Sequence, residues 1–127
     1  MVKVLIVDDE ESILCLLSAI VGTMPECVVL SARTGQEAIE TVRLERPDII
    51  LLDNIMPGMS GIEVCRSIKT DPELLKTRIL MLSCQGQNFD WEKAREFGAS
   101  GYLSKPFDTT AVLEKIKELA YRPGTAN

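Results

Sequence analysis

Five polar side chains with complementary chemistry each stand at the end of a short apolar run. They are Asp8 and Asp9 after residues 4–7, Asp53 after 49–52, Ser83 after 79–82, and Lys105 after 101–104. Carboxylate oxygens bind hard divalent cations such as Mg²⁺, and a carboxylate can also attack phosphorus. A hydroxyl and an ammonium group can contact phosphoryl oxygens. Brought together, these side chains would form a site for a divalent cation and a phosphoryl group.

The apolar runs themselves predict how the five side chains are positioned. Each run is about four or five residues long and is bounded by turn residues, which is typical of strands buried on both faces of a parallel sheet. The carboxyl ends of parallel strands lie along one edge of the sheet, where open α/β folds bind their ligands. We therefore expect the five side chains to converge at that edge.

The order of strand-like and helix-like segments predicts an α/β fold, a doubly wound five-stranded parallel sheet of (βα)₅ type with strand order 2-1-3-4-5. The predicted strands cover residues 3–7, 28–30, 49–52, 79–82 and 101–104. Predicted helices occupy 13–21, 36–45, 62–68 and 88–97, and a last one runs to Leu119 from a cap at Asp108 or Thr109. The inward stripe of the first helix is Ile13, Leu16, Leu17, Ile20 and Val21, and the Asp71-Pro72 pair breaks or restarts the third helix. We expect one domain over 1–121 and a polar tail or linker stub over 122–127.

Composition excludes several classes of protein. The chain has 127 residues, a net charge of −5 and a pI near 4.8, which argues against a general binder of the nucleic-acid backbone. No apolar run is long enough to cross a bilayer, and Met1–Lys3 leads directly into a strand without a signal peptide. These features predict a cytoplasmic protein that binds neither membrane nor nucleic acid.

Cysteine and histidine content narrows the chemistry further. The chain has four cysteines without C-x-x-C spacing and no histidine, so a zinc site and His-based catalysis are not expected. Cys15 and Cys65 fall within amphipathic helical patterns, which predicts reduced, packed thiols.

Charge balance predicts the metal. Three carboxylates and one ammonium leave a residual charge of minus two, which one Mg²⁺ or Mn²⁺ would match. We expect Asp9 and Asp53 as direct ligands, Asp8 as a ligand directly or through water, and the backbone carbonyl of Ile55 as a further ligand. Asp53 would then attack phosphorus, while Lys105 and Ser83 contact the phosphoryl oxygens. No Gly-rich phosphate loop is present, so the phosphoryl donor must be external.

These residues and their spacing closely resemble the receiver domain of two-component response regulators, from about Lys3 to Leu119. The matching segments are Val7-Asp8-Asp9-Glu10, Leu52 to Gly61, Ser83, and Gly98 to Phe107. The resemblance implies a flavodoxin-like fold, with Asp53 as phosphoacceptor, Asp8 and Asp9 as the metal-binding pair, and Lys105 as the phosphate-contacting lysine. It also implies that Ser83 and Tyr102 form a switch, and that the Lys105-Pro106 bond is cis.

The resemblance further implies the partners. The donor would be a phosphohistidine on a sensor histidine kinase or a phosphotransfer protein. Phosphorylation would alter the face made by the fourth helix, fifth strand and fifth helix, which would act on an output domain or a separate protein. A homodimer on activation is common in similar proteins.

Two departures and two alternative functions remain at this point. Asn54 replaces the usual apolar residue after the phosphoacceptor, and Cys84 stands where a small residue is usual.

The chain could instead be a small phosphatase that forms an aspartyl phosphate, although Ile55 occupies the second position of the expected Asp-x-Asp. It could also be a phosphorylation-independent binding domain.

Trp91 is expected in a core stripe with Ala94 and Phe97, or else on a partner-binding face.

Overall fold

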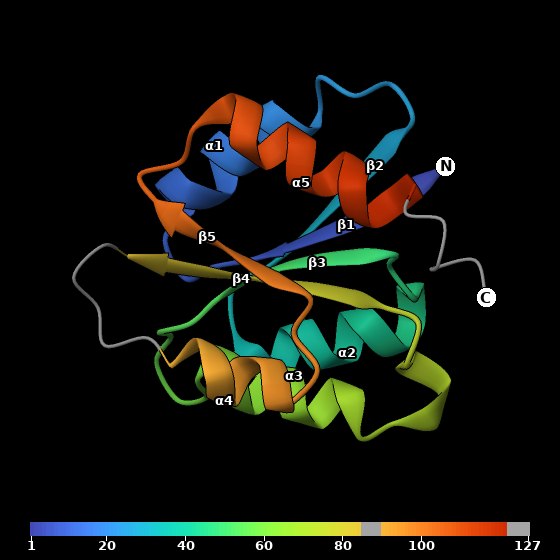
Figure 1. Cartoon of the computed structure of the whole chain (residues 1–127), viewed down its shortest axis with the longest axis vertical. Helices are drawn as coiled ribbons and strands as arrows, with labels where there is room; N and C mark the ends of the chain where they lie inside the picture. The colour runs from blue at the N-terminus through green and yellow to red at the C-terminus, as the bar shows by residue number, and fades with distance from the viewer. Residues whose placement is uncertain (85–89, 122–127) are drawn as a thin grey trace.

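The computed structural model of the chain describes residues 1–84 and 90–121. Its centre is a parallel five-stranded sheet in the order β2-β1-β3-β4-β5, which confirms the predicted fold class and topology (Figure 1). The strands are β1 (Val2–Val7), β2 (Cys27–Ala32), β3 (Ile49–Asp53), β4 (Arg78–Cys84) and β5 (Gly101–Lys105).

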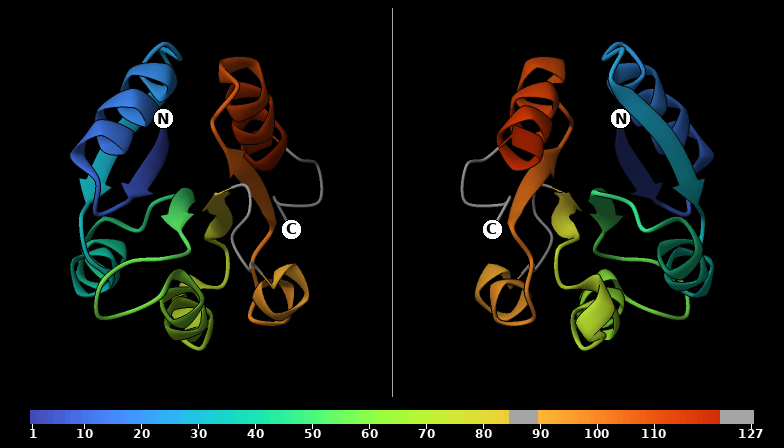
Figure 2. Two further views of the ribbon diagram at one scale, coloured as in Figure 1. Left: turned by 90° about the vertical axis from the view of Figure 1, so that its left-hand side faces the viewer. Right: turned by 90° about the vertical axis from the view of Figure 1, so that its right-hand side faces the viewer.

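Helices cover both faces of the sheet, as right-handed crossovers between parallel strands require. The helices are α1 (Glu11–Val21), α2 (Gly35–Glu45), α3 (Gly61–Lys69), α4 (Trp91–Glu96) and α5 (Thr109–Tyr121), with a 3₁₀ turn η1 (Pro72–Leu74). Helices α1 and α5 lie on one face, and α2, α3 and α4 lie on the other (Figures 1 and 2).

The apolar runs are continuous because successive strand side chains enter two different cores. Leu52 and Met81 pack beneath α2, α3 and α4. Leu51 and Leu82 belong to the second core, beneath α1 and α5. All five residues of β3 are buried, so this central strand holds Asp53 firmly at its end.

Side-chain caps set several of the helix starts. Thr34 and Ser60 each accept the backbone N–H three residues ahead, at the starts of α2 and α3. Asp71 caps η1 by accepting the Glu73 N–H, two residues ahead, as the Asp-Pro pair predicts. Asp108 caps α5, since its Oδ1 accepts the Thr110 N–H at 3.1 Å. The predicted start of the fourth helix at residue 88 lies outside the described residues, as does the predicted tail at 122–127.

Two expectations about α1 are wrong. Leu16, predicted to face inward, is 45% exposed, while Leu14 is buried in its place. Cys15 is exposed, whereas Cys65 is buried as predicted. Both errors come from the helical phase, because the buried stripe of Leu14, Leu17, Ile20 and Val21 leaves Leu16 at its edge and Cys15 on the opposite side of the helix.

Among the described residues, no helix has both the length and the apolar character needed to span a membrane.

Candidate functional site

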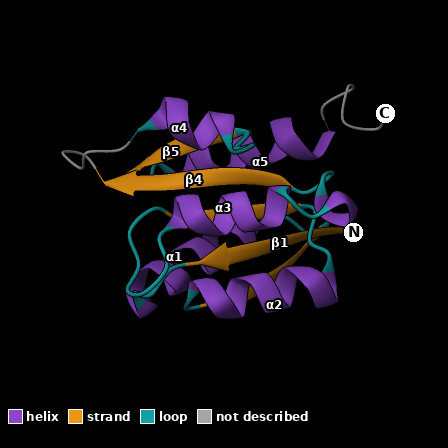
Figure 3. Ribbon diagram, turned by 90° about the horizontal axis from the view of Figure 1, so that it is seen from below, coloured by secondary structure: helices purple, strands orange, loops and turns teal. Residues whose placement is uncertain are grey.

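The sheet gathers the predicted residues at its carboxyl edge. Strands β1 and β4 point the same way in Figure 3. Val7 pairs with Leu52 at the ends of β1 and β3, and Asp53 pairs with Leu82 of β4. Cys84, directly after Ser83, pairs with Lys105 of β5. The register therefore brings four separate strand ends to one place.

Three carboxylates form a compact acidic cluster at this edge. One ligand oxygen from each of Asp8, Asp9 and Asp53 lies within 4.8 Å of the others. Asp8 and Asp53 are buried, at 0% and 3% exposure, whereas Asp9 is open to solvent. Oxygen donors at this spacing, reachable from one side, fit a hard divalent cation that keeps part of its water shell.

Lys105 bridges the two buried acids. Its Nζ lies 3.1 Å from Asp8 Oδ2 and 3.3 Å from Asp53 Oδ1, and its side chain is only 11% exposed. The other Asp8 oxygen, Oδ1, accepts the Glu10 N–H at 2.9 Å, which fixes the orientation of that carboxylate. The Lys105-Pro106 bond is cis, in agreement with the resemblance.

Burial and like charge dominate the electrostatics of Asp53. Burial, followed by the neighbouring charge of Asp8, raises the pKa of Asp53 to about 6, even though Lys105 and the Ile55 N–H act to lower it. Burial alone would favour neutral Lys105, but its hydrogen bond to Asp8 and the two acid charges outweigh burial and raise its pKa. The Lys105 ammonium therefore stays charged. Its positive charge is too small to offset the burial of the Asp53 carboxylate and the neighbouring charge of Asp8.

Ser83 and Tyr102 lie on the neighbouring strands β4 and β5. Ser83 is 5% exposed near the end of β4, and Tyr102 is 45% exposed on β5. The exposure of Tyr102 rules out the simple core position that its aromatic character would favour. Ile55 is also exposed, and its backbone N–H bonds the Asp53 carboxylate, while the role of its carbonyl stays a prediction.

Gly61 contributes to the site in a way that the sequence reasoning missed. A Cβ at this position would lie 2.2 Å from the Asp53 carbonyl oxygen and 2.9 Å from the Asn54 Cα. The Gly61 N–H also donates to the Asn54 carbonyl at 2.9 Å. Only glycine allows α3 to begin this close to the end of β3. The available signal was a glycine directly after the Ser60 helix cap.

Trp91 was expected either in a core stripe or on a partner-binding face. The structure supports the core stripe, and the partner-binding face stays a prediction. Ala94 is buried, whereas Trp91 and Phe97 are half-buried and pack on the core. The Trp91 ring also contacts the Tyr102 ring.

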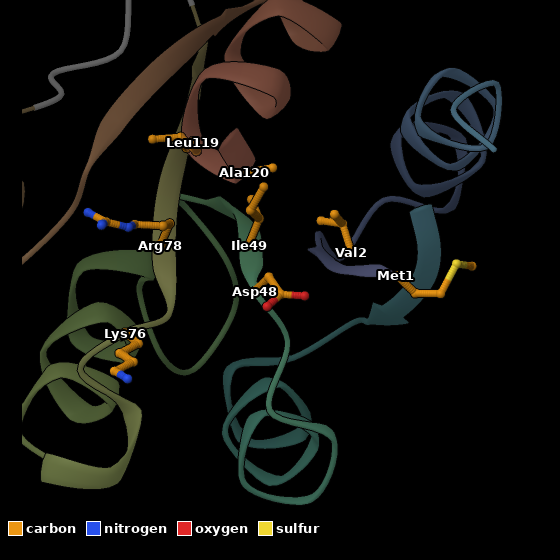
Figure 4. A pocket seen from close by; sticks show the side chains of 8 residues that line it. All are labelled: Met1, Val2, Asp48, Ile49, Lys76, Arg78, Leu119 and Ala120. Carbon is orange, nitrogen blue, oxygen red and sulfur yellow. The ribbon is translucent and has the colours of Figure 1, made fainter. Parts of the chain in front are cut away.

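A separate hollow of about 220 Å³ lies at the opposite edge of the sheet. It includes the first residues of β1, β3 and β4 and the last turn of α5 (Figure 4). Its charged side chains, Asp48, Lys76 and Arg78, point in different directions in Figure 4. They do not converge on a common point. The charged side chains that do lie together are those at the carboxyl edge, Asp8, Asp9 and Asp53.

Comparison with known proteins identifies the pattern. The family described as "Response regulator receiver domain" matches residues 4–117. The alkaline phosphatase synthesis transcriptional regulatory protein PhoP of Bacillus subtilis is 38% identical over 120 residues, covering 94% of this chain and 49% of that protein. The phosphate regulon transcriptional regulatory protein PhoB of Pseudomonas aeruginosa is 35% identical, covering 95% of this chain and 52% of that protein.

A solved structure is similar over nearly its whole length. The chemotaxis protein CheY4 of Vibrio cholerae has a TM-score of 0.86 and 31% identity, covering 94% of this chain and 98% of that one. In contrast, the chain spans about half the length of the curated relatives that it matches.

Proposed function

The chain belongs to the response regulator receiver domain family of two-component systems, and from that premise we propose that Asp53 is its phosphoacceptor. The observation that carries the proposal is the buried position of Asp53 between Asp8 and Lys105, within reach of Asp9. A carboxylate in this setting can serve as nucleophile if positive charge keeps it ionised.

We propose that Asp53 receives the phosphoryl group from a phosphohistidine of a sensor histidine kinase or phosphotransfer protein. A bond forms between an Asp53 oxygen and phosphorus, and the bond between phosphorus and the donor nitrogen breaks. The electron pair of that broken bond stays on the donor imidazole. No histidine occurs in this chain, which agrees with an external donor.

Lys105 and Ser83 would stabilise the transferred group. The Lys105 ammonium donates hydrogen bonds to both Asp8 and Asp53. A short movement would bring it to a phosphoryl oxygen. Ser83 stands one strand away and would donate its hydroxyl to another oxygen. Phosphoryl transfer depends mainly on such positioning and charge stabilisation, so this small set of groups suffices.

Mg²⁺ suits the donor set of Asp8, Asp9, Asp53 and the Ile55 carbonyl, and when bound it would neutralise charge on the phosphoryl oxygens. Mn²⁺ would serve similarly. The raised pKa of Asp53 supports this assignment, because it indicates that the acids need additional positive charge.

Phosphorylation would act through a switch. We propose that Ser83 moves toward the phosphoryl group and that Tyr102 follows inward, which changes the face made by α4, β5 and α5. A phosphoryl group can shift this equilibrium only through contacts that differ between the two states. The output is then a further domain or a separate protein that binds this face, and dimerisation on activation stays a prediction.

In this account the domain promotes only its own phosphorylation and dephosphorylation and does not turn over a separate substrate. We place this reaction in the cytoplasm, because the proposed donor obtains its phosphoryl group from ATP there.

The test is incubation with acetyl phosphate and Mg²⁺, followed by intact mass. Wild type should gain one phosphoryl group, and Asp53→Asn, which keeps size and shape, should gain none. Removing Mg²⁺ with a chelator should suppress the gain. An unmodified wild type, or equal gain in Asp53→Asn, would support the binding-domain alternative or a different acceptor. Repeated turnover of a free phosphoester would support the phosphatase alternative.

A further inference from the structure

The switch residue Tyr102 is in contact with a second aromatic ring. The centroids of the Trp91 and Tyr102 rings lie 5.2 Å apart, with a tilt of 48° between their planes. Trp91 is the first residue of α4 and Tyr102 lies in β5, so the contact joins two of the three elements of the proposed signalling face. Aromatic pairs at such distances are stabilising beyond the area that they bury.

The sheet register places Tyr102 and Ser83 on the same face. Tyr102 pairs with Met81, and Ser83 pairs with Ser104. Paired residues of neighbouring parallel strands face the same side, and alternate residues of one strand also do. Met81 packs in the core beneath α2, α3 and α4. Tyr102 and Ser83 are therefore diagonal neighbours on the face of the sheet that α4 covers (Figure 1).

Trp91 is anchored in the core. It is half-buried and packs against the core beneath α4. Its helix is capped by Asp90, whose Oδ1 accepts the Lys93 N–H at 3.0 Å, and is fixed by buried Ala94. Tyr102 is 45% exposed. Because Trp91 is held by its helix and by the core, a movement of Tyr102 toward Ser83 would change the contact between the two rings.

We propose that Trp91 is a positioning residue that holds Tyr102 in its outward position and so favours the unphosphorylated state. This inference rests on the proposed switch at Asp53. An aromatic pair of ordinary strength shifts such an equilibrium by about twofold to tenfold. That shift is small enough for a phosphoryl group to overcome and large enough to set the basal level of the active state.

Intrinsic fluorescence tests the proposal directly, because Trp91 is the single tryptophan of the chain. Phosphorylation with acetyl phosphate and Mg²⁺ should change the Trp91 emission in step with the phosphorylated fraction, measured by intact mass on the same samples. In Tyr102→Leu the mass gain should persist while the emission change is largely lost. Mass gain with unchanged emission in wild type would overturn the inference and leave the proposed function intact. Absence of mass gain would overturn both.

Binding of beryllium trifluoride, which mimics a phosphoryl group on a carboxylate, measures the size of the effect. Trp91→Leu should bind this mimic in the presence of Mg²⁺ about twofold to tenfold more tightly than wild type, measured by calorimetry. Trp91→Phe retains a ring and should restore most of the wild-type affinity.

Phe97 offers the matched control. It is half-buried and packs on the same core, and its ring centroid lies 5.5 Å from the central carbon of the Arg66 guanidinium. Phe97→Leu therefore removes a comparable ring without touching the switch, and its affinity for the mimic should match wild type. Equal affinities in Trp91→Leu and wild type, or equal gains in Trp91→Leu and Phe97→Leu, would overturn the inference.

Discussion

The surroundings of Asp53 destabilise its ionised form. Burial and the nearby Asp8 oppose ionisation, and Lys105 offsets them only in part, so the pKa of Asp53 is raised to about 6. The same groups that hold Asp53 in place thus create the demand for a cation. In the proposed function, metal binding and nucleophile activation would therefore have one electrostatic cause.

Replacing Asp53 with Asn should stabilise the metal-free protein at pH 7. The pKa of Asp53 is raised from 3.8 in the unfolded chain to about 6 in the folded chain. The folded state therefore holds the proton more tightly, and stability falls as pH rises between these values. At pH 7 the ionised carboxylate costs about 2–3 kcal/mol, which Asn does not incur. Urea unfolding with a chelator present should show this gain.

The pH dependence distinguishes this cause from a general packing effect. The advantage of Asp53→Asn should shrink as pH falls from 7 toward 4, because wild-type Asp53 then becomes neutral. An advantage that stays constant across this range would contradict the electrostatic account.

Removing the bridging charge should have the opposite effect. Lys105→Met leaves Asp8 and Asp53 buried without their ammonium, so the metal-free protein should lose about 3 kcal/mol of unfolding free energy. Mg²⁺ should recover more stability in this variant than in wild type, because it supplies the missing positive charge. Melting temperatures with and without Mg²⁺ measure both effects. A smaller Mg²⁺ shift in Lys105→Met than in wild type would count against a shared pocket.

At the residue scale, sequence reasoning located the acids, the hydroxyl and the lysine because each ends an apolar strand, and strand ends depend only on local pattern. It misplaced Cys15 and Leu16, because which part of a broad apolar stripe turns inward depends on the partner elements. It also did not predict the Trp91–Tyr102 ring contact, which joins an α4 residue to β5 and follows from tertiary packing.

The connection from β3 to α3 is the element on which the site's geometry depends most. Gly61→Ala would place a methyl group 2.2 Å from the Asp53 carbonyl oxygen. We expect a loss of about 2–4 kcal/mol in unfolding free energy, from the overpacking, together with much slower phosphorylation because Asp53 must shift. Chemical denaturation and the phosphorylation time course check the two effects.

Gly58 in the same loop is the matched control. Its φ is +85°, but a Cβ there would meet nothing within 4 Å. Gly58→Ala should therefore cost only about 1 kcal/mol from backbone strain and leave Asp53 in place. Equal loss of phosphorylation in both glycine variants would show that the close approach of Gly61 is not the cause.

Element types and order were predictable because apolar runs and helical periodicity are strong local signals. Helix and strand boundaries were less predictable, because they depend on capping. Asp108 rather than Thr109 caps α5. The fourth predicted helix also ends one residue earlier than expected, at Glu96, where Phe97 takes a non-helical conformation.

At the scale of the whole molecule, one parallel sheet collects charges from distant parts of the chain and exposes one of them. Asp9 is exposed, unlike Asp8 and Asp53. Asp9→Asn should therefore change metal-free stability by less than about 0.5 kcal/mol. It should nevertheless remove most of the stabilisation by Mg²⁺, which reaches about 2.7 kcal/mol at a hundredfold excess over Kd in wild type. Urea unfolding at several Mg²⁺ concentrations checks this, and an undiminished Mg²⁺ effect would remove Asp9 from the metal site.

The central claim is that the phosphoryl group is carried by Asp53 and by no other acid of the cluster. Reduction of the phosphorylated chain with borohydride converts an aspartyl phosphate into homoserine, which peptide mass spectrometry can locate. We expect homoserine at position 53, and only in samples that received both the phosphoryl donor and Mg²⁺. Homoserine at position 8 or 9, or a stable phosphoryl group on a hydroxyl such as that of Ser83, would contradict the account.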